Sequence, residues 1–194
     1  DATTTIFNGL VDKGIFEVYY QEIGRLNKSD VATFELNALN PSQQGAFSAI
    51  LESFQQKNVC LLHGVTSSGK TEIYIHLIQE ALKQGKQVLY LLPEIALTTQ
   101  ITERLKRVFG KRLGVYHSKF PDAERVEIWK KQLGDEEYDV ILGVRSSIFL
   151  PFKRLGLVIV DEEHENTYKQ QDPAPRYNAR SSAIMLASMY GAKV

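Results

Sequence analysis

Short apolar runs and segments of helical period alternate along the chain from about residue 40 to its end. The runs are rich in valine, leucine and isoleucine, and each stops at a glycine, a proline or a polar residue, which is typical of buried strands. Five runs have this character, at 58–64, 87–93, 112–118, 139–144 and 155–161. The last three residues, 192–194, have the composition of the start of a further strand.

Five helices are predicted between these runs, at 40–56, 71–85, 98–110, 121–134 and 178–191. In the first four, apolar residues recur at spacings of three and four, so they share one face of each helix. Gly85 and Gly110 are placed to end two helices, and Pro121 to begin another. The inward positions that this spacing predicts are Ala46, Phe47, Ile50, Leu51, Phe54, Ile73, Leu77, Ile78, Ala81, Leu82, Ile101, Leu105, Val108, Val126, Trp129 and Leu133.

Strands that alternate with helices favour right-handed crossovers, and therefore an α/β fold with a parallel sheet covered by helices on both faces. Ligands of such sheets bind at the carboxyl ends of the strands. Residues 1–33 do not show this alternation of apolar runs and helical segments. We interpret them as the tail of a separate small module followed by a linker, and residues 34–194 as one domain.

The composition is that of a globular protein, with 43% apolar and 24% charged residues. No stretch approaches the roughly 20 apolar residues of a membrane helix, and the first residues form neither a basic leader nor an apolar signal core. One cysteine, Cys60, excludes an internal disulfide framework and a cysteine-rich zinc site. These features favour a cytoplasmic protein that does not enter a membrane. Basic and acidic residues number 23 each, which argues against binding nucleic acid by bulk charge alone but allows a local basic surface.

A glycine-rich turn, "GVTSSGKT" at 64–71, follows the first predicted strand and opens an amphipathic helix. It satisfies the phosphate-binding pattern G-x-x-x-x-G-K-[ST] in the context that the pattern requires. Backbone N–H groups would point at the phosphates, Lys70 would add a charge, and the Thr71 hydroxyl would ligate Mg²⁺. The alternative is a turn that matches by chance. The predicted nucleotide-binding residues are Gly64, Val65, Thr66, Ser67, Ser68, Gly69, Lys70 and Thr71.

Carboxylates follow the strand predicted at 155–161, in the sequence "LVIVDEEH". Asp161 then lies where the metal of a bound nucleotide would sit, and Glu162 is placed to orient and deprotonate an attacking water. A cation and a solvated cleft would compensate the charges there. The alternative is an acidic loop on a solvated surface. The predicted catalytic residues are Lys70, Asp161 and Glu162, and the predicted magnesium ligands are Thr71 and Asp161.

The two motifs together resemble those of superfamily-2 helicases of the DExH type. Longer stretches resemble the PriA (primosomal protein N′) family of bacterial replication-restart helicases over about residues 39–194. This resemblance implies a RecA-like P-loop NTPase lobe, preceded by a short piece of a winged-helix-like module at "LVDKGIFEVYY". The matching stretches are "LNPSQQGAFSAI", "GVTSSGKTEIY", "LLPEIALTTQ", "YHSKFPDAERVEIWKKQL", "GVRSSIFLPFKRLGLVIVDEEHENTYKQQ" and "PRYNAR".

The resemblance also implies roles for residues outside the two motifs. Gln43 would read the adenine edge, or would simply be an exposed glutamine at a helix start. Thr98, Arg145 and Ser146 would contact the DNA backbone. His164 would link the nucleotide site to the DNA side, or only make local hydrogen bonds. The loop after the carboxylates would stack on bases and reposition Glu162, or its tyrosines would pack down; its residues are Tyr168, Lys169, Gln170, Arg176 and Tyr177.

The sequence departs from the family pattern at three places. Asn178 and Ser181 stand where histidine and aspartate are expected, which puts the fine coupling of the loop in question, and Ser67 replaces a glycine of the turn. The chain ends before a third motif, a second RecA-like lobe and the zinc segment of the intact family protein. The resemblance therefore implies one half of a motor, which would bind nucleotide weakly and hydrolyse it slowly.

Several other conspicuous side chains are interpreted as structural. Cys60 and Trp129 are expected in the core. His117 is equally consistent with a plain cap and with a function. A basic cluster is expected to be a solvated helix face rather than a DNA track; it comprises Arg104, Lys106, Arg107, Lys111 and Arg112.

Together these features predict the first RecA-like lobe of an ATP-dependent DNA helicase, with ATP and Mg²⁺ as cofactors. The resemblance implies 3′→5′ polarity and a role in replication restart. The family resemblance implies single-stranded and fork DNA, primosome proteins and single-strand-binding proteins as partners. Two alternatives remain open, a duplex translocase that does not separate strands and a DNA-structure-binding scaffold with a dispensable ATPase.

Overall fold

The structure is a computed structural model that describes residues 9–15, 36–65, 68–117 and 120–194. In the predicted tail of the preceding module, residues 9–12 are helical. Most of the rest of that tail and most of the linker lie outside the described residues, as do Thr66 and Ser67 of the glycine-rich turn. None of the described helices is long and apolar enough to cross a membrane.

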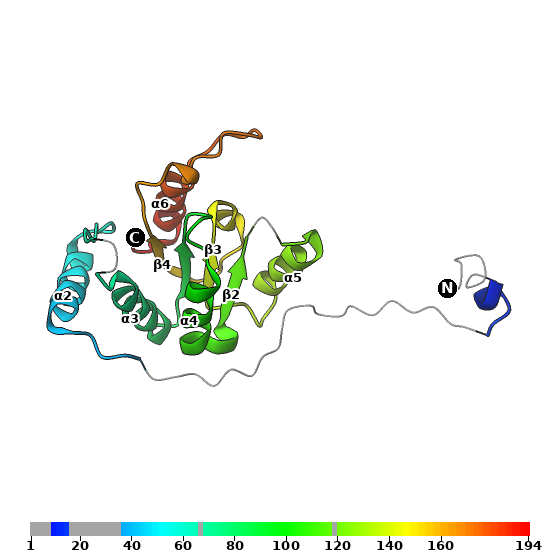
Figure 1. Cartoon of the computed structure of the whole chain (residues 1–194), viewed down its shortest axis with the longest axis horizontal. Helices are drawn as coiled ribbons and strands as arrows, with labels where there is room; N and C mark the ends of the chain where they lie inside the picture. Colours follow the sequence, from blue (N-terminus) through cyan, green and yellow to red (C-terminus); the bar gives the residue numbers. More distant parts are fainter. Residues whose placement is uncertain (1–8, 16–35, 66–67, 118–119) are drawn as a thin grey trace.

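Four parallel strands form the sheet, in the order β2-β3-β1-β4. The crossovers between them confirm the predicted α/β fold (Figure 1). Four of the predicted apolar runs become these strands, namely β1 Gln87–Leu91, β2 Leu113–Tyr116, β3 Val140–Gly143 and β4 Leu155–Val160.

Helices form at all five predicted places, and capping side chains define where several of them begin. Asn40 and Gln43 form a capping box at the start of α2, while Thr98 caps α4 and Asn178 caps α6. The helices are α2 Pro41–Gln56, α3 Lys70–Lys83, α4 Thr99–Phe109, α5 Asp122–Leu133 and α6 Ala179–Tyr190. Three 3₁₀ turns were not predicted, η1 Gly110–Arg112, η2 Arg145–Phe149 and η3 Asn166–Tyr168.

The sheet separates two apolar layers, because successive side chains of a strand point to opposite faces. Val88 and Tyr90 of β1 pack with α2, α3 and α4, whereas Leu89 and Leu91 pack with α5, α6 and η2. All five inward positions predicted for α3 are buried. Both faces of the sheet are thus covered, as the near-continuous apolar strands indicated.

The run at 58–64 is not a strand, contrary to the prediction. Within the described residues, its backbone hydrogen bonds join it to Val194. The Val194 N–H donates to the Asn58 carbonyl, and the Val194 carbonyl accepts from the Cys60 N–H. Lys193 in turn makes a single parallel bridge to Leu157 of β4. The segment therefore joins the sheet through a two-residue link that is too short for a ladder, and Cys60 is only partly buried.

Helix α5 turns the opposite face inward from the one that its apolar spacing predicted. Val126, Trp129 and Leu133 are 52%, 42% and 57% exposed, whereas Ile128 and Gln132 are fully buried. The Gln132 side chain accepts a hydrogen bond from the backbone N–H of residue 138 at 2.8 Å. Its side-chain oxygen thus has a partner inside the core, whereas Nε2 of the same amide is buried without one among the described residues. The hydrogen bond to the oxygen lets a polar residue occupy a position that periodicity assigns to an apolar one.

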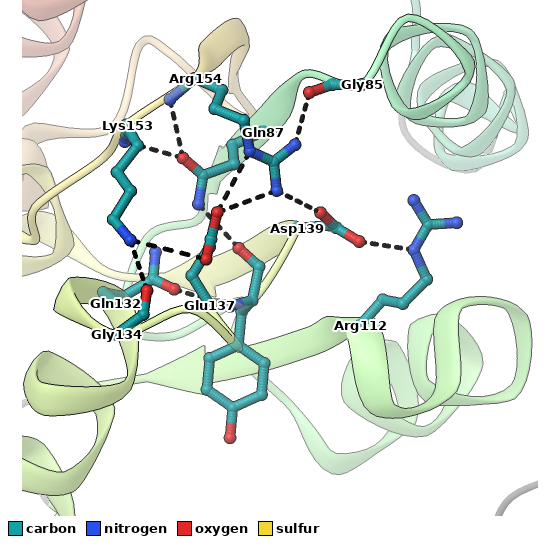
Figure 2. A network of polar contacts seen from close by, with 10 residues as sticks. Gly85, Gln87, Arg112, Gln132, Gly134, Glu137, Asp139, Lys153 and Arg154 are labelled. Carbon is teal, nitrogen blue, oxygen red and sulfur yellow. Dashed lines mark hydrogen bonds and ion pairs between the residues drawn. The ribbon is translucent and has the colours of Figure 1, made fainter.

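A polar network ties together the amino ends of all four strands, opposite the edge where ligands bind (Figure 2). The fully buried Gln87 accepts from the backbone N–H groups of Lys153 and Arg154 and donates to the carbonyl of Tyr138. Arg154 also pairs with Asp139 and Glu137. The residues that directly precede β3 and β4 are thereby held against the first residue of β1.

We expect Gln87→Ala to destabilise the domain by about 2–4 kcal/mol, because one buried and two partly buried backbone groups lose their partner. For a chain of this size, that corresponds to a melting temperature lower by about 5–15 °C. Thermal unfolding followed by circular dichroism measures the change. The exposed Gln55→Ala is the matched control, expected to lie within about 0.5 kcal/mol of the parent. Equal melting temperatures for the two variants would contradict the role of the network.

Candidate functional site

The glycine-rich turn leads into α3 at the carboxyl edge of the sheet, and its geometry requires glycine at residue 69. Gly69 has a φ of 81°, and a Cβ there would lie 2.3 Å from Nε2 of Gln43. A larger residue would therefore be strained by the backbone conformation and would displace the end of the Gln43 side chain. At Gly64 a Cβ would lie 3.0 Å from Oγ of Ser68. The turn is thus closely packed.

The structure brings Lys70 and the acidic motif together. Lys70 Nζ donates to the carbonyl of Gly64 at 2.9 Å, and the carbonyl of Val65 lies 3.4 Å away. The same Nζ lies 3.8 Å from Oε1 of Glu162. The ammonium group therefore sits between the turn and the carboxylate that follows β4.

Phenol groups surround the Asp161 carboxylate. Tyr90 donates to Oδ2 at 3.0 Å, the Tyr74 hydroxyl lies 3.5 Å from Oδ1, and the Glu162 N–H donates to Oδ1 at 3.0 Å. Burial raises the pKa of Asp161, although these hydrogen bonds act in the opposite direction. A partly desolvated carboxylate with a fixed orientation is well suited to hold a cation.

Glu162 adopts a left-handed backbone conformation, with a φ of 47°. It is the one non-glycine residue with positive φ in the described part of the chain. Such strain costs about 1–3 kcal/mol and concentrates at functional sites. His164 is largely exposed, and its Nε2 lies 3.9 Å from Oε2 of Glu162, so the structure places it at the outer side of the carboxylate.

A cavity of about 340 Å³ lies between the two motifs. Its donor set of hydroxyl, ammonium, backbone N–H and carboxylate groups fits a magnesium-bound polyphosphate. Among the described residues there is no group of three or more His, Cys, Asp or Glu side chains that could hold a metal. Phosphate oxygens and water would therefore complete a magnesium shell that includes Thr71 and Asp161. The lining residues are Ser68, Gly69, Lys70, Thr71, Arg104, Asp161 and Glu162. Arg104 was predicted to lie on a solvated helix face. The structure places it in the cavity lining, which its own sequence segment gave no reason to expect.

Gln43 lies against the glycine-rich turn. Its Nε2 donates to the carbonyl of Gly69 at 3.2 Å, and its Oε1 accepts from the Asn40 N–H at 3.0 Å. Gln43 is therefore more than an exposed glutamine at a helix start. It connects the beginning of α2 to the turn that would hold the phosphates.

The side chains predicted to contact DNA are partly engaged within the protein. The Thr98 hydroxyl caps α4 by accepting from the Ile101 N–H. Arg145 donates to the carbonyls of Thr167 and Lys169, at 3.3 and 3.2 Å, and lies 3.7 Å from Glu94. Oγ of Ser146 is buried without a hydrogen-bond partner in the part of the chain that the structure describes. Arg145 thus holds the loop after β4 against the segment after β1.

Tyr168 does not project for base stacking, contrary to the prediction. It is 1% exposed, and its hydroxyl donates to the carbonyl of Asp161 at 2.6 Å. The Leu91 carbonyl lies 3.2 Å from the same hydroxyl. The ring packs into the core beneath the carboxylates because η3 turns it inward. Its place in the structure is that of a support for Asp161.

The rest of the loop extends from the body beside α6, as Figure 1 shows. Lys169 and Asn178 form an antiparallel bridge at its base. Tyr177 is half-buried, with its ring 5.0 Å from that of Phe149. Arg176 is exposed. Among the tyrosines and basic residues predicted for DNA contact in this loop, Arg176 is thus the most accessible.

The chain resembles known proteins in both sequence and fold. The pattern of the DEAD/DEAH box helicase family matches residues 40–188. The chain is 39% identical over its whole length to replication restart protein PriA of Bacillus subtilis and covers 24% of that protein. It is 41% identical over 96% of its length to replication restart protein PriA of Haemophilus influenzae and covers 26% of it. The chain therefore spans about a quarter of the length of these relatives.

Two solved structures share the fold at 20% sequence identity. One is a nuclease-deletion mutant of the Type ISP restriction-modification enzyme LlaGI, in complex with a DNA substrate mimic; the TM-score is 0.53, over 68% of this chain and 16% of that one. The other is the SWI2/SNF2 ATPase core of Sulfolobus solfataricus, in complex with dsDNA; the TM-score is 0.50, over 71% of this chain and 28% of that one. Both likenesses concern the α/β fold.

Proposed function

Because the chain belongs to the DEAD/DEAH box helicase family, we propose that it is the ATP-binding lobe of a DNA helicase of replication restart. The observation that carries the proposal is the position of Lys70 Nζ, 3.8 Å from Glu162 and in the same cavity as Asp161. The likeness to the PriA proteins supports the biological role.

The residues around the cavity have distinct roles in this proposal. Lys70 exchanges its carbonyl contacts for the phosphates of ATP, while Thr71 and Asp161 hold Mg²⁺. When bound, Mg²⁺ offsets the negative charge on the phosphates. Glu162 orients a water for attack on the terminal phosphate and accepts its proton. Gln43 reads the adenine edge.

DNA would act on this site through the segments after β1 and β4. Arg145 contacts both segments, and Tyr168 lies directly below Asp161. A DNA strand that displaced Arg145 would free the loop, and Tyr168 would pass the displacement to Asp161 and Glu162. The proposal also includes 3′→5′ translocation on single-stranded and fork DNA, partnership with primosome and single-strand-binding proteins, and a cytoplasmic location. The likeness to replication restart proteins supports these parts.

The decisive experiment measures ATP hydrolysis and strand displacement by the full-length protein, with and without single-stranded DNA. We expect DNA to stimulate hydrolysis and ATP to be required for displacement. DNA-stimulated hydrolysis without displacement would favour a duplex translocase. Restart activity that survives Lys70→Ala would favour a scaffold with a dispensable ATPase.

We expect Arg176→Ala to lower the DNA-stimulated ATPase rate by about tenfold, the effect of one lost charge-assisted contact worth about 1.5 kcal/mol. The basal rate should stay unchanged, because Arg176 is exposed on the loop. Steady-state ATPase assays with and without single-stranded DNA measure both rates. The exposed neighbour Gln171→Ala is the control, and equal loss of both rates in Arg176→Ala would contradict a DNA-side role.

A further inference from the structure

Arg104 reaches the predicted phosphate cavity from α4, a helix outside both nucleotide motifs. It lines the same 340 Å³ space as Lys70, Asp161 and Glu162. Because Arg104 and Glu162 line the same space, a phosphate attacked by a water on Glu162 would lie within the space that Arg104 also lines. The helix itself begins at Thr98, one of the predicted DNA contacts.

A carboxylate on α3 holds Arg104 in place. Nη2 of Arg104 pairs with Oε1 of Glu72, and Nδ2 of Asn37 donates to the same oxygen at 3.2 Å. Glu72 is the more buried partner, with its side chain 14% exposed against 42% for Arg104. The buried carboxylate therefore fixes the position of the arginine. A guanidinium has five N–H donors, so donors remain for an anion.

The balance of charge favours an anion beside Arg104. Lys70 and Arg104 bring two positive charges to the cavity, Asp161 and Glu162 bring two negative ones, and Glu72 behind Arg104 adds a third negative charge. Mg²⁺ bound at Asp161 would leave the walls net positive, which suits a group as negative as a terminal phosphate. Arginine binds phosphate through parallel hydrogen bonds that a single ammonium group cannot make.

We infer that Arg104 is a ligand of the terminal phosphate of ATP, held ready by Glu72. The inference rests on the proposed function and deepens it, because it makes α4 an element that distinguishes ATP from ADP. ADP lacks the γ-phosphate, which is the terminal phosphate of ATP. Arg104 therefore contributes to the binding of ATP and little to that of ADP. The start of α4 at Thr98 would then respond to the state of the nucleotide.

Competition against a fluorescent nucleotide, with the full-length protein, tests this directly. Arg104→Ala should weaken the binding of a non-hydrolysable ATP analogue about tenfold or more and change the binding of ADP less than about twofold. Arg104→Lys should recover part of the loss, since it restores a point charge without the fork. Arg107→Ala, an exposed arginine one turn further along α4, should change neither affinity.

Glu72→Gln separates phosphate binding from a merely structural ion pair. If Arg104 only ties α4 to α3, both Arg104→Ala and Glu72→Gln will lower the melting temperature and weaken ATP and ADP equally, and the inference is overturned. If Arg104 binds phosphate, Glu72→Gln will keep the preference for the ATP analogue. Lys70→Ala is measured in parallel, because nucleotide binding that survives this change refutes the proposed function itself and not only the role of Arg104.

Discussion

Lys70→Ala should weaken nucleotide binding by about 10- to 100-fold or more. The ammonium group is the one lysine charge in the phosphate cavity. A charge-assisted hydrogen bond contributes about 1.5–3 kcal/mol, and each 1.4 kcal/mol is tenfold in affinity. Hydrolysis and any strand displacement by the full-length protein should be lost with it. Isothermal titration with ADP and with a non-hydrolysable ATP analogue measures the affinities.

Lys83→Ala is the matched control for this change. Lys83 lies at the other end of α3, where it pairs with Glu80 on the surface. Its removal takes away a lysine from the same helix and should leave nucleotide affinity as it was. Indistinguishable affinities for Lys70→Ala and Lys83→Ala would remove the glycine-rich turn from the nucleotide site.

Glu162→Gln is expected to separate binding from turnover. The amide keeps the size and much of the hydrogen bonding of the carboxylate but cannot accept a proton from water. Proton transfer by a positioned side chain contributes about 10²- to 10⁴-fold to a rate, so turnover should fall by that factor while ATP affinity stays within about threefold. Single-turnover hydrolysis together with equilibrium binding distinguishes the two quantities.

Glu163→Gln, a change at the neighbouring carboxylate, is the control for Glu162→Gln. Glu163 pairs with Arg180 of α6, 2.6 Å away, and thus faces a different partner from Glu162. Glu163→Gln should retain most of the turnover. A Glu162→Gln enzyme that hydrolyses ATP at the normal rate would assign the water-activating role to another group.

The sheet and its helices were predictable because their signals are local. Val88, Tyr90 and their neighbours form an uninterrupted apolar run, which only a strand covered on both faces can bury. Asn40 and Thr98 mark helix starts through contacts within one turn of chain. The turn at 64–71 and the acids at 161–162 could be recognised because each is a short sequence pattern, although the run before the turn is not a strand. The roles assigned to their residues stay predictions.

The errors concern side chains whose surroundings come from distant segments. Trp129 was placed inward by apolar spacing, but Gln132 is the fully buried residue, and its side-chain oxygen accepts a hydrogen bond from a backbone N–H of the following segment. Tyr168 was assigned to base stacking by the family resemblance, and the unpredicted 3₁₀ turn places it in the core, as in the alternative that the tyrosines of the loop pack down. Neither neighbour can be deduced from periodicity.

The parts of the site that sequence reasoning missed are contributed by other elements of the fold. Tyr74 and Tyr90 meet at Asp161 only because β1 pairs with β4 and α3 packs across both. Arg104 reaches the cavity because α4 lies beside α3, where Glu72 receives it. None of these residues belongs to either nucleotide motif. Their place at the site follows only from contacts between elements that are distant in the sequence.

The two contacts of Gln43 limit what its amide can still offer to a base. A glutamine side chain has two N–H donors and two oxygen lone pairs. One donor is used by Gly69 and one lone pair by Asn40. What remains is a single donor and a single acceptor, the complement of the N7 and N6 groups of adenine. Guanine presents two acceptors at the corresponding edge. The remaining donor and acceptor of Gln43 would therefore favour adenine over guanine.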